Sequence, residues 1–297
     1  MKLICGPNCD PGLAYGLASC LKAKPESCCI RNKDDQSAEV NIESNLNGEA
    51  IVIADSLTPP LHTNLVNLLL IIDAVKRAGA GEITVLVPYF GYVRQNRIIP
   101  GTAVPAELVN KLITASGADK VYSIDTHSKI TGINNICPTE LFAKSLGKYT
   151  KEMTPDRITV LSPDNGSIAR ARQLAGLLNT SFASIAKTRS SDGQIAGSLS
   201  QPTLTENCII VDDIIDSGAT MDYACLAAIK AGAESLILCC THLLNWASVQ
   251  AIIDKYPQIT QLLTTNTINQ LAVCNKLIPL DVSDLFVENL CKASMLS

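Results

Sequence analysis

Cys208–Thr220 reads CIIVDDIIDSGAT, and this stretch decides how the rest of the chain is interpreted. The apolar, β-branched run that opens it predicts a buried strand. The predicted strand ends at Val211, and two adjacent acids, Asp212 and Asp213, follow it. A helical pattern begins at Met221. Carboxylates at the end of a strand can accept hydrogen bonds from the vicinal hydroxyls of a sugar. The stretch therefore predicts a strand, a polar loop and a helix that together can hold a ligand.

The loop between this strand and helix consists of small residues, DSGAT at 216–220. A helix that starts there offers its backbone N–H groups and the positive end of its dipole to an anion such as phosphate. Acids beside an anion site favour a phosphorylated sugar, with hydroxyls at one end and phosphate at the other. The alternative is an ordinary buried strand before a capped helix, but two unpaired acids at a strand end are costly without a polar ligand.

The composition is that of a folded protein with room for two ordinary domains. Of the 297 residues, 47% are hydrophobic and 18% are charged. The longest run of Leu and Ile, Leu68–Ile72, is too short to span a bilayer, and the N-terminal MKLICGPNCDPG lacks the pattern of a secretion signal. The formal net charge of −4 argues against general nucleic-acid binding. We therefore expect a cytoplasmic protein that has neither nucleic acid nor membrane as a partner.

The chain has twelve cysteines, but their spacing is not typical of a metal site. It contains no C-x-x-C pair, and two of its pairs, Cys28-Cys29 and Cys239-Cys240, are adjacent. Cys208 and Cys239 lie inside apolar runs, where a free thiol behaves as a small hydrophobic group. We expect buried thiols in a reducing compartment rather than disulfides or structural zinc.

One pattern of strand, helix, Gly-Ala turn and strand occurs twice in the chain. The strand Ile51–Ala54 leads through a helix to Gly79-Ala80, and the strand Ile209–Val211 leads through a helix to Gly232-Ala233. Strands that alternate with helices predict mainly parallel sheets flanked by helices, the α/β class. The repetition itself predicts two similar domains that arose by internal duplication.

The boundary between the two domains is expected near residues 140–155, where Gly, Lys and Pro residues break the apolar pattern. The domains would then comprise residues 1–145 and 146–297. In parallel sheets of this kind, ligands bind at the carboxyl ends of the strands. Polar segments follow several predicted strands there, so these strand ends could form one composite site; they are Tyr89–Arg97, Asp125–Ser128, Asp164–Ser167 and Lys187–Arg189.

Five motifs occur in an order that resembles a known family. PYFGYVRQNR, SIDTHS, SPDNGSIARAR, KTR and VDDIIDSGAT follow one another as in the ribose-phosphate diphosphokinases, the phosphoribosyl pyrophosphate synthases. The resemblance implies two similar domains of phosphoribosyltransferase type. It also implies transfer of the β,γ-diphosphoryl group of Mg-ATP to the C1 hydroxyl of ribose 5-phosphate, giving phosphoribosyl pyrophosphate and AMP. A homo-oligomer, a dimer or a hexamer, is implied as well.

The resemblance assigns roles at matching positions. It implies that Asp212 and Asp213 hold the ribose hydroxyls, and that Lys187 and Arg189 belong to a mobile loop and stabilise charge on the transferring group. The residues implied for the 5-phosphate are Asp216, Ser217, Gly218, Ala219 and Thr220. The residues implied for ATP are Asp35, Arg94, Gln95, Arg97 and His127.

Magnesium is the cofactor that the resemblance implies. His127 matches a ligand of the ATP-bound ion, and Asp164 matches an acid near a second metal on the ribose side. A hard cation is suited to neutralise the negative charges around a transferring diphosphoryl group. From the residues alone, His127 could equally be a polar histidine of the core, and Asp164 could simply be the acid of a Pro-Asp-Asn-Gly turn.

The sequence departs from the family pattern at two informative places. Lys33–Ser37 aligns with the adenine-binding loop, but only Asp35 agrees with it. Ala219 stands where the family often has a second glycine, and its Cβ would cost about 1 kcal/mol if that position required a positive φ. Two alternatives follow from these departures and from the sugar-phosphate loop: a non-catalytic or regulatory relative, and a phosphoribosyltransferase that consumes phosphoribosyl pyrophosphate.

Overall fold

The computed structural model describes residues 1–35, 37–95, 99–150, 153–189, 195–269 and 274–294. Contacts divide the chain into two compact units. The first unit comprises Met1–Cys137, Asn266–Asn269 and Asp281–Ser297, and the second comprises Pro138–Thr265 and Gln270–Leu280. None of the helices in the described ranges is both long and apolar enough to cross a membrane.

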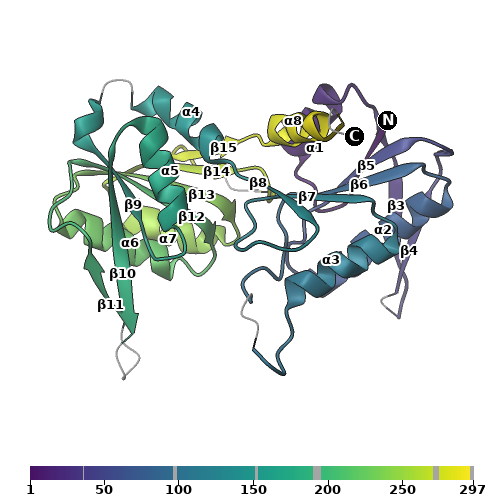
Figure 1. Cartoon of the computed structure of the whole chain (residues 1–297), viewed down its shortest axis with the longest axis horizontal. Coiled ribbons are helices and arrows are strands. Elements are labelled where there is room, and N and C mark those ends of the chain that lie inside the picture. The colour runs from purple at the N-terminus through teal and green to yellow at the C-terminus, as the bar shows by residue number, and fades with distance from the viewer. Residues whose placement is uncertain (36, 96–98, 151–152, 190–194, 270–273, 295–297) are drawn as a thin grey trace. The chain divides into compact units, whose positions relative to one another are not determined.

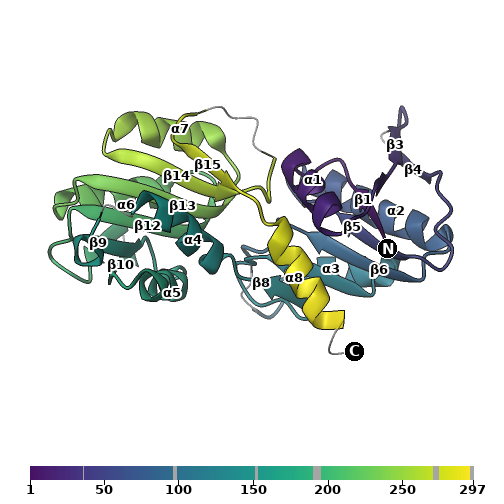
Figure 2. The same ribbon diagram turned by 90° about the horizontal axis from the view of Figure 1, so that it is seen from above.

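The first unit contains a six-stranded sheet whose strands are β1 (Lys2–Cys5), β2 (Pro25–Glu26), β5 (Ala50–Ala54), β6 (Glu82–Val87), β7 (Lys120–Ile124) and β8 (Ile133–Ile136). Their order is β2-β1-β5-β6-β7-β8, and each neighbouring pair is parallel. The flanking helices are α1 (Pro11–Cys20), α2 (Leu61–Arg77), α3 (Pro105–Ser116) and α8 (Ser283–Ser294). Figures 1 and 2 show α1 and α8 side by side on one face of this sheet, and Figure 1 shows α2 and α3 on the other. Both faces are thus covered, as a parallel sheet of apolar strands requires.

The second unit contains a seven-stranded sheet whose strands are β9 (Ile158–Ser162), β10 (Ser181–Arg189), β11 (Ile195–Leu199), β12 (Asn207–Ile215), β13 (Ser235–Leu243), β14 (Ile259–Thr265) and β15 (Leu277–Leu280). The order is β11-β10-β9-β12-β13-β14-β15, and only the β10–β11 pair is antiparallel. The helices are α4 (Thr139–Tyr149), α5 (Ile168–Leu178), α6 (Ala219–Lys230) and α7 (Trp246–Lys255), with a short 3-10 turn at Pro155–Arg157. Apolar residues of α6 and α7 pack into one core with the sheet, and those of α4 and α5 into another.

The two sheets repeat one topology. Without β11, the order β10-β9-β12-β13-β14-β15 of the second unit matches β2-β1-β5-β6-β7-β8 of the first, strand for strand. In each unit the central strand, β5 or β12, leads into a helix and then into a parallel neighbour. The predicted α/β fold with an internal duplication is confirmed.

The division into units differs from the expected ranges 1–145 and 146–297 in two respects. Pro138 already begins the second unit, because α4 buries Phe142 and Leu146 in the core that it shares with α5. The C-terminal segment returns to the first unit, where α8 packs against α1 and the Cys20 thiol donates a hydrogen bond to Asp284 at 3.2 Å. The break in the apolar pattern near 147–155 therefore marks the end of α4 rather than the end of a domain.

The cysteines are only partly buried. Cys208 and Cys239 are buried in the second unit, as their apolar surroundings predict. Four others are exposed, which corrects the expectation of generally buried thiols; they are Cys20, Cys29, Cys137 and Cys291. These four lie on helix surfaces, on the β3–β4 hairpin (Cys28–Asn32 and Ala38–Ile42) and next to the junction of the two units, where little apolar surface surrounds them.

Candidate functional site

The second unit's sheet has a step at its central strand. β12 pairs with β9 only as far as Ile210, opposite Leu161, but it pairs with β13 as far as Ile215, opposite Leu243. Asp212 and Asp213 therefore lie on a continuing strand that has lost its neighbour on one side. The sequence predicted that this strand ends at Val211, which was wrong because the hydrogen bonds with β13 sustain it for four more residues.

Asp212 is held in a nearly closed polar environment. Its side chain is 6% exposed, and its Oδ1 accepts hydrogen bonds from the Ser167 hydroxyl at 2.5 Å and from the Asp213 N–H at 3.0 Å. Burial, and then the neighbouring charge of Asp213, raise the pKa of Asp212 to about 7, and Asp164 adds to this effect. Burial and the neighbouring acids disfavour the ionised form of this carboxyl. A ligand that donates hydrogen bonds or carries positive charge would stabilise that form.

Asp213 has a cationic neighbour that the sequence did not point to. Arg170 on α5 places Nη2 3.9 Å from Asp213 Oδ2 and donates from Nη1 to the Ser167 hydroxyl oxygen at 3.2 Å. The Arg170 side chain is 13% exposed, so its charge acts in a poorly solvated place. Its position three residues after Ser167, at the start of α5, was the available signal. Arg170 thus ties the two acids to the start of that helix.

Ser167 and Asp164 shape the loop between β9 and α5. Ser167 occupies the N-cap position of α5, but its hydroxyl donates to Asp212 and accepts from none of the helix's first N–H groups. Asp164 closes the turn before the helix, since its Oδ1 accepts from the N–H groups of Gly166 at 3.0 Å and Ser167 at 3.3 Å. The turn interpretation of Asp164 is confirmed by these bonds, and they leave its role as a metal ligand a prediction.

The loop after β12 places its one left-handed residue at Gly218. Gly218 has φ +77° and occupies the N-cap position of α6, and Ala219 is the first helical residue. Position 219 therefore does not require a positive φ, and the Cβ of Ala219 does not destabilise the loop. A glycine N-cap has no side chain to bond to the helix's first N–H groups, which suits an anion at that end. Within the loop Gly218 is buried, Ser217 and Ala219 are exposed, and Asp216 and Thr220 are half-buried.

Lys187 and Arg189 lie inside a strand and not after one. The sequence predicted that their strand ends at Ala186, but β10 runs on to Arg189 because β11 pairs with it antiparallel, Lys187 opposite Gly197 and Arg189 opposite Ile195. Figure 1 shows this hairpin projecting from the rest of the second unit's sheet. The side chains of Lys187 and Arg189, and residues 190–194 of the expected mobile loop, lie outside the part of the chain that the structure describes.

In the first unit, the residues expected to contact ATP follow β6. Tyr89 and Phe90 are buried, so these aromatic residues pack in the core. The Leu57 N–H donates to the Tyr89 carbonyl at 2.9 Å and fixes the start of the segment. Arg94 and Gln95 are exposed at its end. Arg97 lies outside the described residues.

His127 follows β7, the neighbour of β6 in the sheet. Asp125 has φ +46°, which is uncommon for a residue other than glycine and marks a tight turn. Its N–H donates to the Ile136 carbonyl at 2.9 Å, and the Thr126 N–H donates to Asn135 Oδ1 at 2.8 Å. Both bonds anchor the turn to β8, and His127 is exposed within the turn. Exposure argues against the alternative that His127 is a histidine of the core.

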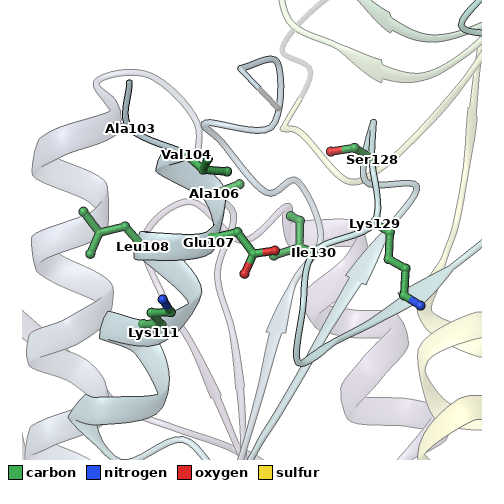
Figure 3. Close-up of a pocket in the computed structure, with 9 residues that line it drawn as sticks. All are labelled: Ala103, Val104, Ala106, Glu107, Leu108, Lys111, Ser128, Lys129 and Ile130. Atoms are coloured by element: carbon green, nitrogen blue, oxygen red, sulfur yellow. The ribbon is translucent and has the colours of Figure 1, made fainter. Parts of the chain in front are cut away.

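A pocket of about 600 Å³ lies beside the His127 turn. Figure 3 shows α3 and the residues just before it on one side, and the segment that follows His127 on the other. Glu107 of α3 joins the two sides, because its carboxylate accepts from the N–H and the hydroxyl of Thr131, both at 3.1 Å. The lining residues are Ala103, Val104, Ala106, Glu107, Leu108, Lys111, Ser128, Lys129 and Ile130.

Asp35, the one match in the adenine loop, lies in the turn of the β3–β4 hairpin. Its Oδ1 accepts from the Ser37 hydroxyl at 2.6 Å and from the Ser37 N–H at 2.9 Å. The Ser37 hydroxyl bond, and then the backbone bond, hold the pKa of Asp35 below its ordinary value. Asp35 is exposed and shapes its own turn, so its proposed contact with ATP would use the remaining oxygen.

The structure thus assembles the predicted residues into two groups, one in each unit. Asp164, Asp212 and Asp213 share the carboxyl edge of the second unit's sheet with the 216–220 loop. Arg94, Gln95 and His127 follow adjacent strands at the carboxyl edge of the first unit's sheet. No three His, Cys, Asp or Glu side chains among the described residues form a complete metal-binding cluster.

Comparison with known proteins matches one family model to each part of the chain. The family model for the N-terminal domain of ribose phosphate pyrophosphokinase matches residues 1–117, and the phosphoribosyl transferase domain model matches residues 134–269. A ribose-phosphate pyrophosphokinase from Clostridium tetani is 34% identical over 97% of this chain and 92% of its own length, and one from Agrobacterium fabrum is 36% identical over 82% and 79%. The crystal structure of phosphoribosylpyrophosphate synthetase from Mycobacterium smegmatis matches with a TM-score of 0.88 at 25% identity, over 100% of this chain and 99% of that one. As its ordered motifs predicted, the chain belongs to the family of ribose-phosphate pyrophosphokinases, ATP-dependent diphosphotransferases.

Proposed function

We propose that this chain transfers the β,γ-diphosphoryl group of ATP to the C1 hydroxyl of ribose 5-phosphate, with the second unit holding the sugar and the first unit contacting ATP. The single observation that carries the proposal is the step at the end of β12. There Asp212 and Asp213 lie a few residues before a glycine-capped helix start, so a hydroxyl acceptor and an anion site are adjacent.

The sugar's vicinal hydroxyls would bind to the two acids. Hydroxyl groups donate best to an ionised carboxylate, so binding would favour the charged form of Asp212 and lower its pKa from about 7. Arg170 would compensate the charge that then accumulates, since it lies 3.9 Å from Asp213. The expected consequence is that ribose 5-phosphate releases protons from the protein when it binds near neutral pH.

The 5-phosphate would bind to the loop at 216–220. The backbone N–H groups at the start of α6 point toward a phosphate placed there, and the helix dipole favours its charge. Gly218 supports this placement because its buried backbone approaches Ile252 of α7 too closely to leave room for a side chain. The phosphate therefore meets a loop whose shape is fixed before the ligand arrives.

Magnesium is the cofactor of the proposed reaction. Oxygen donors suit this ion, and it commonly uses one or two carboxylates together with substrate phosphates rather than a complete protein cage. Asp164 would supply such an oxygen in the second unit, and His127 is the residue proposed near the ATP-bound ion in the first. Burial, and then the neighbouring charges of Asp213 and Asp164, raise the pKa of Asp212, and a positive charge at this edge would offset the repulsion between these acids. When bound, the ion neutralises charge on the transferring phosphates.

The proposed reaction is a direct displacement at the β-phosphorus of ATP. A bond forms between the sugar's C1 oxygen and the β-phosphorus, the bond from that phosphorus to the α,β-bridging oxygen breaks, and AMP leaves with the electron pair. The proton of the C1 hydroxyl passes to solvent. Lys187 and Arg189 are proposed to stabilise charge on the diphosphoryl oxygens, and Asp35, Arg94, Gln95 and Arg97 to hold ATP.

The setting of the reaction is also part of the proposal. We propose a cytoplasmic homo-oligomer, a dimer or a hexamer, that uses ATP and ribose 5-phosphate as substrates. Light scattering coupled to size-exclusion chromatography measures the oligomer directly. A strictly monomeric protein with full activity would contradict this part and leave the reaction itself standing.

The test of the function is AMP release by the purified chain. We expect AMP only when Mg-ATP and ribose 5-phosphate are both present, and much slower AMP release from the Asp212→Asn/Asp213→Asn variant at ribose 5-phosphate concentrations that do not saturate it. No AMP from the folded wild-type chain alone, restored by adding an active relative, would instead support a regulatory subunit. Pyrophosphate release that depends on a nucleobase and phosphoribosyl pyrophosphate would instead support a phosphoribosyltransferase.

A further inference from the structure

The phenol group of Tyr223 bonds to both backbone groups of a single residue. Its hydroxyl oxygen accepts from the Gly197 N–H at 2.9 Å, and the hydroxyl donates to the Gly197 carbonyl at 3.1 Å. Tyr223 lies in the second turn of α6, and Gly197 is the middle residue of β11. One side chain thus fastens the outer strand of the β10–β11 hairpin to a helix of the same unit.

The ladder between β10 and β11 explains why Gly197 needs this partner. In an antiparallel pair, facing residues alternate between those that bond to each other and those whose N–H and C=O point away. The Ser200 N–H donates to the Ser184 carbonyl, and counting from this bonded pair makes Lys187 and Gly197 a pair that does not bond across the ladder. β11 is the last strand of the sheet, so the outward groups of Gly197 face no further strand. Tyr223 replaces the missing strand at this one position.

The packing matches the hydrogen bonds. A Cβ on Gly197 would lie 2.7 Å from the Tyr223 hydroxyl oxygen, 2.8 Å from its Cε1 and 2.9 Å from Cγ2 of Ile185. Because real Cβ atoms do not approach other atoms so closely, the contact depends on glycine at 197. Tyr223 is half-buried and packs against the core shared by α6, α7 and the sheet, so its ring has a fixed support. The backbone of β11 therefore lies directly on a rigid aromatic ring.

The place of the contact connects two parts of the proposed site. Gly197 lies directly opposite Lys187, and Tyr223 follows Thr220, the last residue of the 216–220 loop, by three positions on the same helix. We propose that Tyr223 is a positioning residue, which holds the strand opposite Lys187 at a fixed distance from the helix that begins at the sugar-phosphate loop. The inference rests on the proposed function, because it assigns Tyr223 its effect through Lys187.

The variant Tyr223→Phe tests this directly, because it keeps the ring and removes both hydrogen bonds. We expect kcat for AMP formation to fall about tenfold, equivalent to about 1.4 kcal/mol. The KM for ribose 5-phosphate should stay within about twofold, since the 216–220 loop is untouched. Hydrogen exchange measured by mass spectrometry should rise in the peptide that covers 195–199 and stay unchanged in the sheet strands β12 and β13.

Tyr256→Phe is the matched control. The hydroxyl of Tyr256 also bonds to α6, since it donates to the Asp222 carbonyl at 3.4 Å. Among the described residues, its hydroxyl has no hydrogen bond to the β10–β11 hairpin. This variant should leave kcat and the exchange of 195–199 at wild-type values. A decrease of kcat in Tyr256→Phe that equals the decrease in Tyr223→Phe would show a general loss of helix packing and overturn the positioning role.

The two readouts separate the inference from the function on which it rests. Faster exchange at 195–199 with unchanged kcat in Tyr223→Phe would show that the Tyr223–Gly197 contact (the tether) holds β11 but does not position Lys187. That result would overturn the inference. Unchanged exchange would overturn the tether itself. A wild-type chain that binds ribose 5-phosphate but releases no AMP would overturn the proposed function and with it the positioning role of Tyr223. The exchange result would still decide whether the contact between Tyr223 and Gly197 holds β11 in place.

Discussion

The carboxyl edges of the two sheets occupy equivalent positions in a duplicated fold, but their chemistry differs. At the end of β12 two acids lie beside Arg170 and lead to a loop whose N-cap is Gly218. At the end of β5 one acid, Asp55, is completely buried, and its Oδ1 accepts from the Asn8 N–H at 2.7 Å. The end of β12 thus has side chains that a ligand could contact, whereas the end of β5 is closed by the loop after β1.

The loops that follow explain the difference. Between β5 and α2 the chain contains Pro59 and Pro60, and Pro60 is the N-cap of α2. Proline has no N–H group, so this helix start has lost donors that an anion would need. Leu57 is fully buried in the same loop, and its N–H is used by Tyr89. Duplication preserved the strand and the helix, and the short loop between them differs; in the proposed function only the loop after β12 binds phosphate.

The loops that precede the acids differ as well. In the first unit the chain after β1 passes so close to Asp55 that a Cβ on Gly6 would collide with its carboxyl group. In the second unit the equivalent loop reaches Asp212 with the hydroxyl of Ser167, and it brings Arg170 with it. The same topology thus buries Asp55 under the backbone of one loop and orients Asp212 with a side chain of the other.

The largest effect should come from the hairpin of the second unit. Lys187→Ala should lower kcat on the order of 100- to 1,000-fold with little change in the KM for ribose 5-phosphate, because charge on the transferring group develops only in the transition state. The matched control is Lys33→Ala in the hairpin of the first unit, where Lys33 is paired with Glu39 at 3.6 Å and both are exposed. Steady-state kinetics of AMP release measures both. If Lys187→Ala instead raised the KM at constant kcat, its assigned role would be wrong.

The next effect separates the two carboxyl edges. Asp212→Asn/Asp213→Asn should weaken ribose 5-phosphate binding by about 100-fold. A charged hydrogen-bond acceptor contributes about 1.5–3 kcal/mol, and two acceptors at the lower end of this range contribute about 3 kcal/mol together. Asp55→Asn should leave the affinity unchanged. Isothermal titration calorimetry gives both values. Equal losses from the two edges would contradict the division of roles between the units.

The pH dependence of stability sharpens the same comparison. Burial raises the pKa of Asp55 and of Asp212 to about 7, and the ordinary value in an unfolded chain is about 4. The folded protein therefore binds more protons between pH 4 and 7, and the free energy of unfolding should fall as pH rises through this window. Asp55→Asn should raise the melting temperature at pH 8 and change it little near pH 4.

Ribose 5-phosphate distinguishes the two acids in this experiment. Its hydroxyls would favour the ionised form of Asp212, so saturating ligand should remove that residue's share of the pH dependence. The share of Asp55, which no ligand reaches, should persist. Thermal melts at several pH values, with and without ligand, give the comparison. A pH dependence that the ligand leaves unchanged would argue against sugar binding at Asp212.

The smallest effect concerns the first residues of α6. Ala219→Gly should lower the free energy of unfolding by up to about 1 kcal/mol and not improve sugar binding, because Ala219 has helical geometry. Gly218→Ala should cost more and weaken binding, because its φ of +77° disfavours a side chain and a Cβ would lie 2.9 Å from Ile252. Chemical denaturation and titration measure the pair. If Ala219→Gly improved binding and Gly218→Ala had no effect, the position that requires glycine would be 219 rather than 218.

The elements that local pattern defines were predictable. The strands near Ile51, Ile83, Val121 and Ile209 are present, and Gly79 ends α2 with φ +89° as its position suggested. Apolar runs and Gly-Ala turns are short-range signals, so they can be recognised in the sequence without knowledge of the fold. The acids and the small-residue loop after β12 were also predicted, because the strand, the acids and the loop are contiguous in the sequence.

The features that were not predicted depend on distant parts of the chain. β1 has only four residues, Lys2–Cys5, and became interpretable only when paired with β5. The length of β10 depends on β11, whose IAGSL sequence is a weak strand signal. Arg170 matters because Asp213 lies next to it in space. The burial of Asp55 results from the loop after β1, which nothing in the duplicated pattern indicates.

Hydrogen exchange with and without ribose 5-phosphate tests the central claim most directly, because one experiment follows both carboxyl edges in the unmodified protein. The ligand should slow exchange in peptides that cover 211–222, where the acids and the start of α6 lie, and leave peptides that cover 54–62 unchanged. Protection at 54–62 with none at 211–222 would contradict the assignment of the sugar phosphate to the second unit.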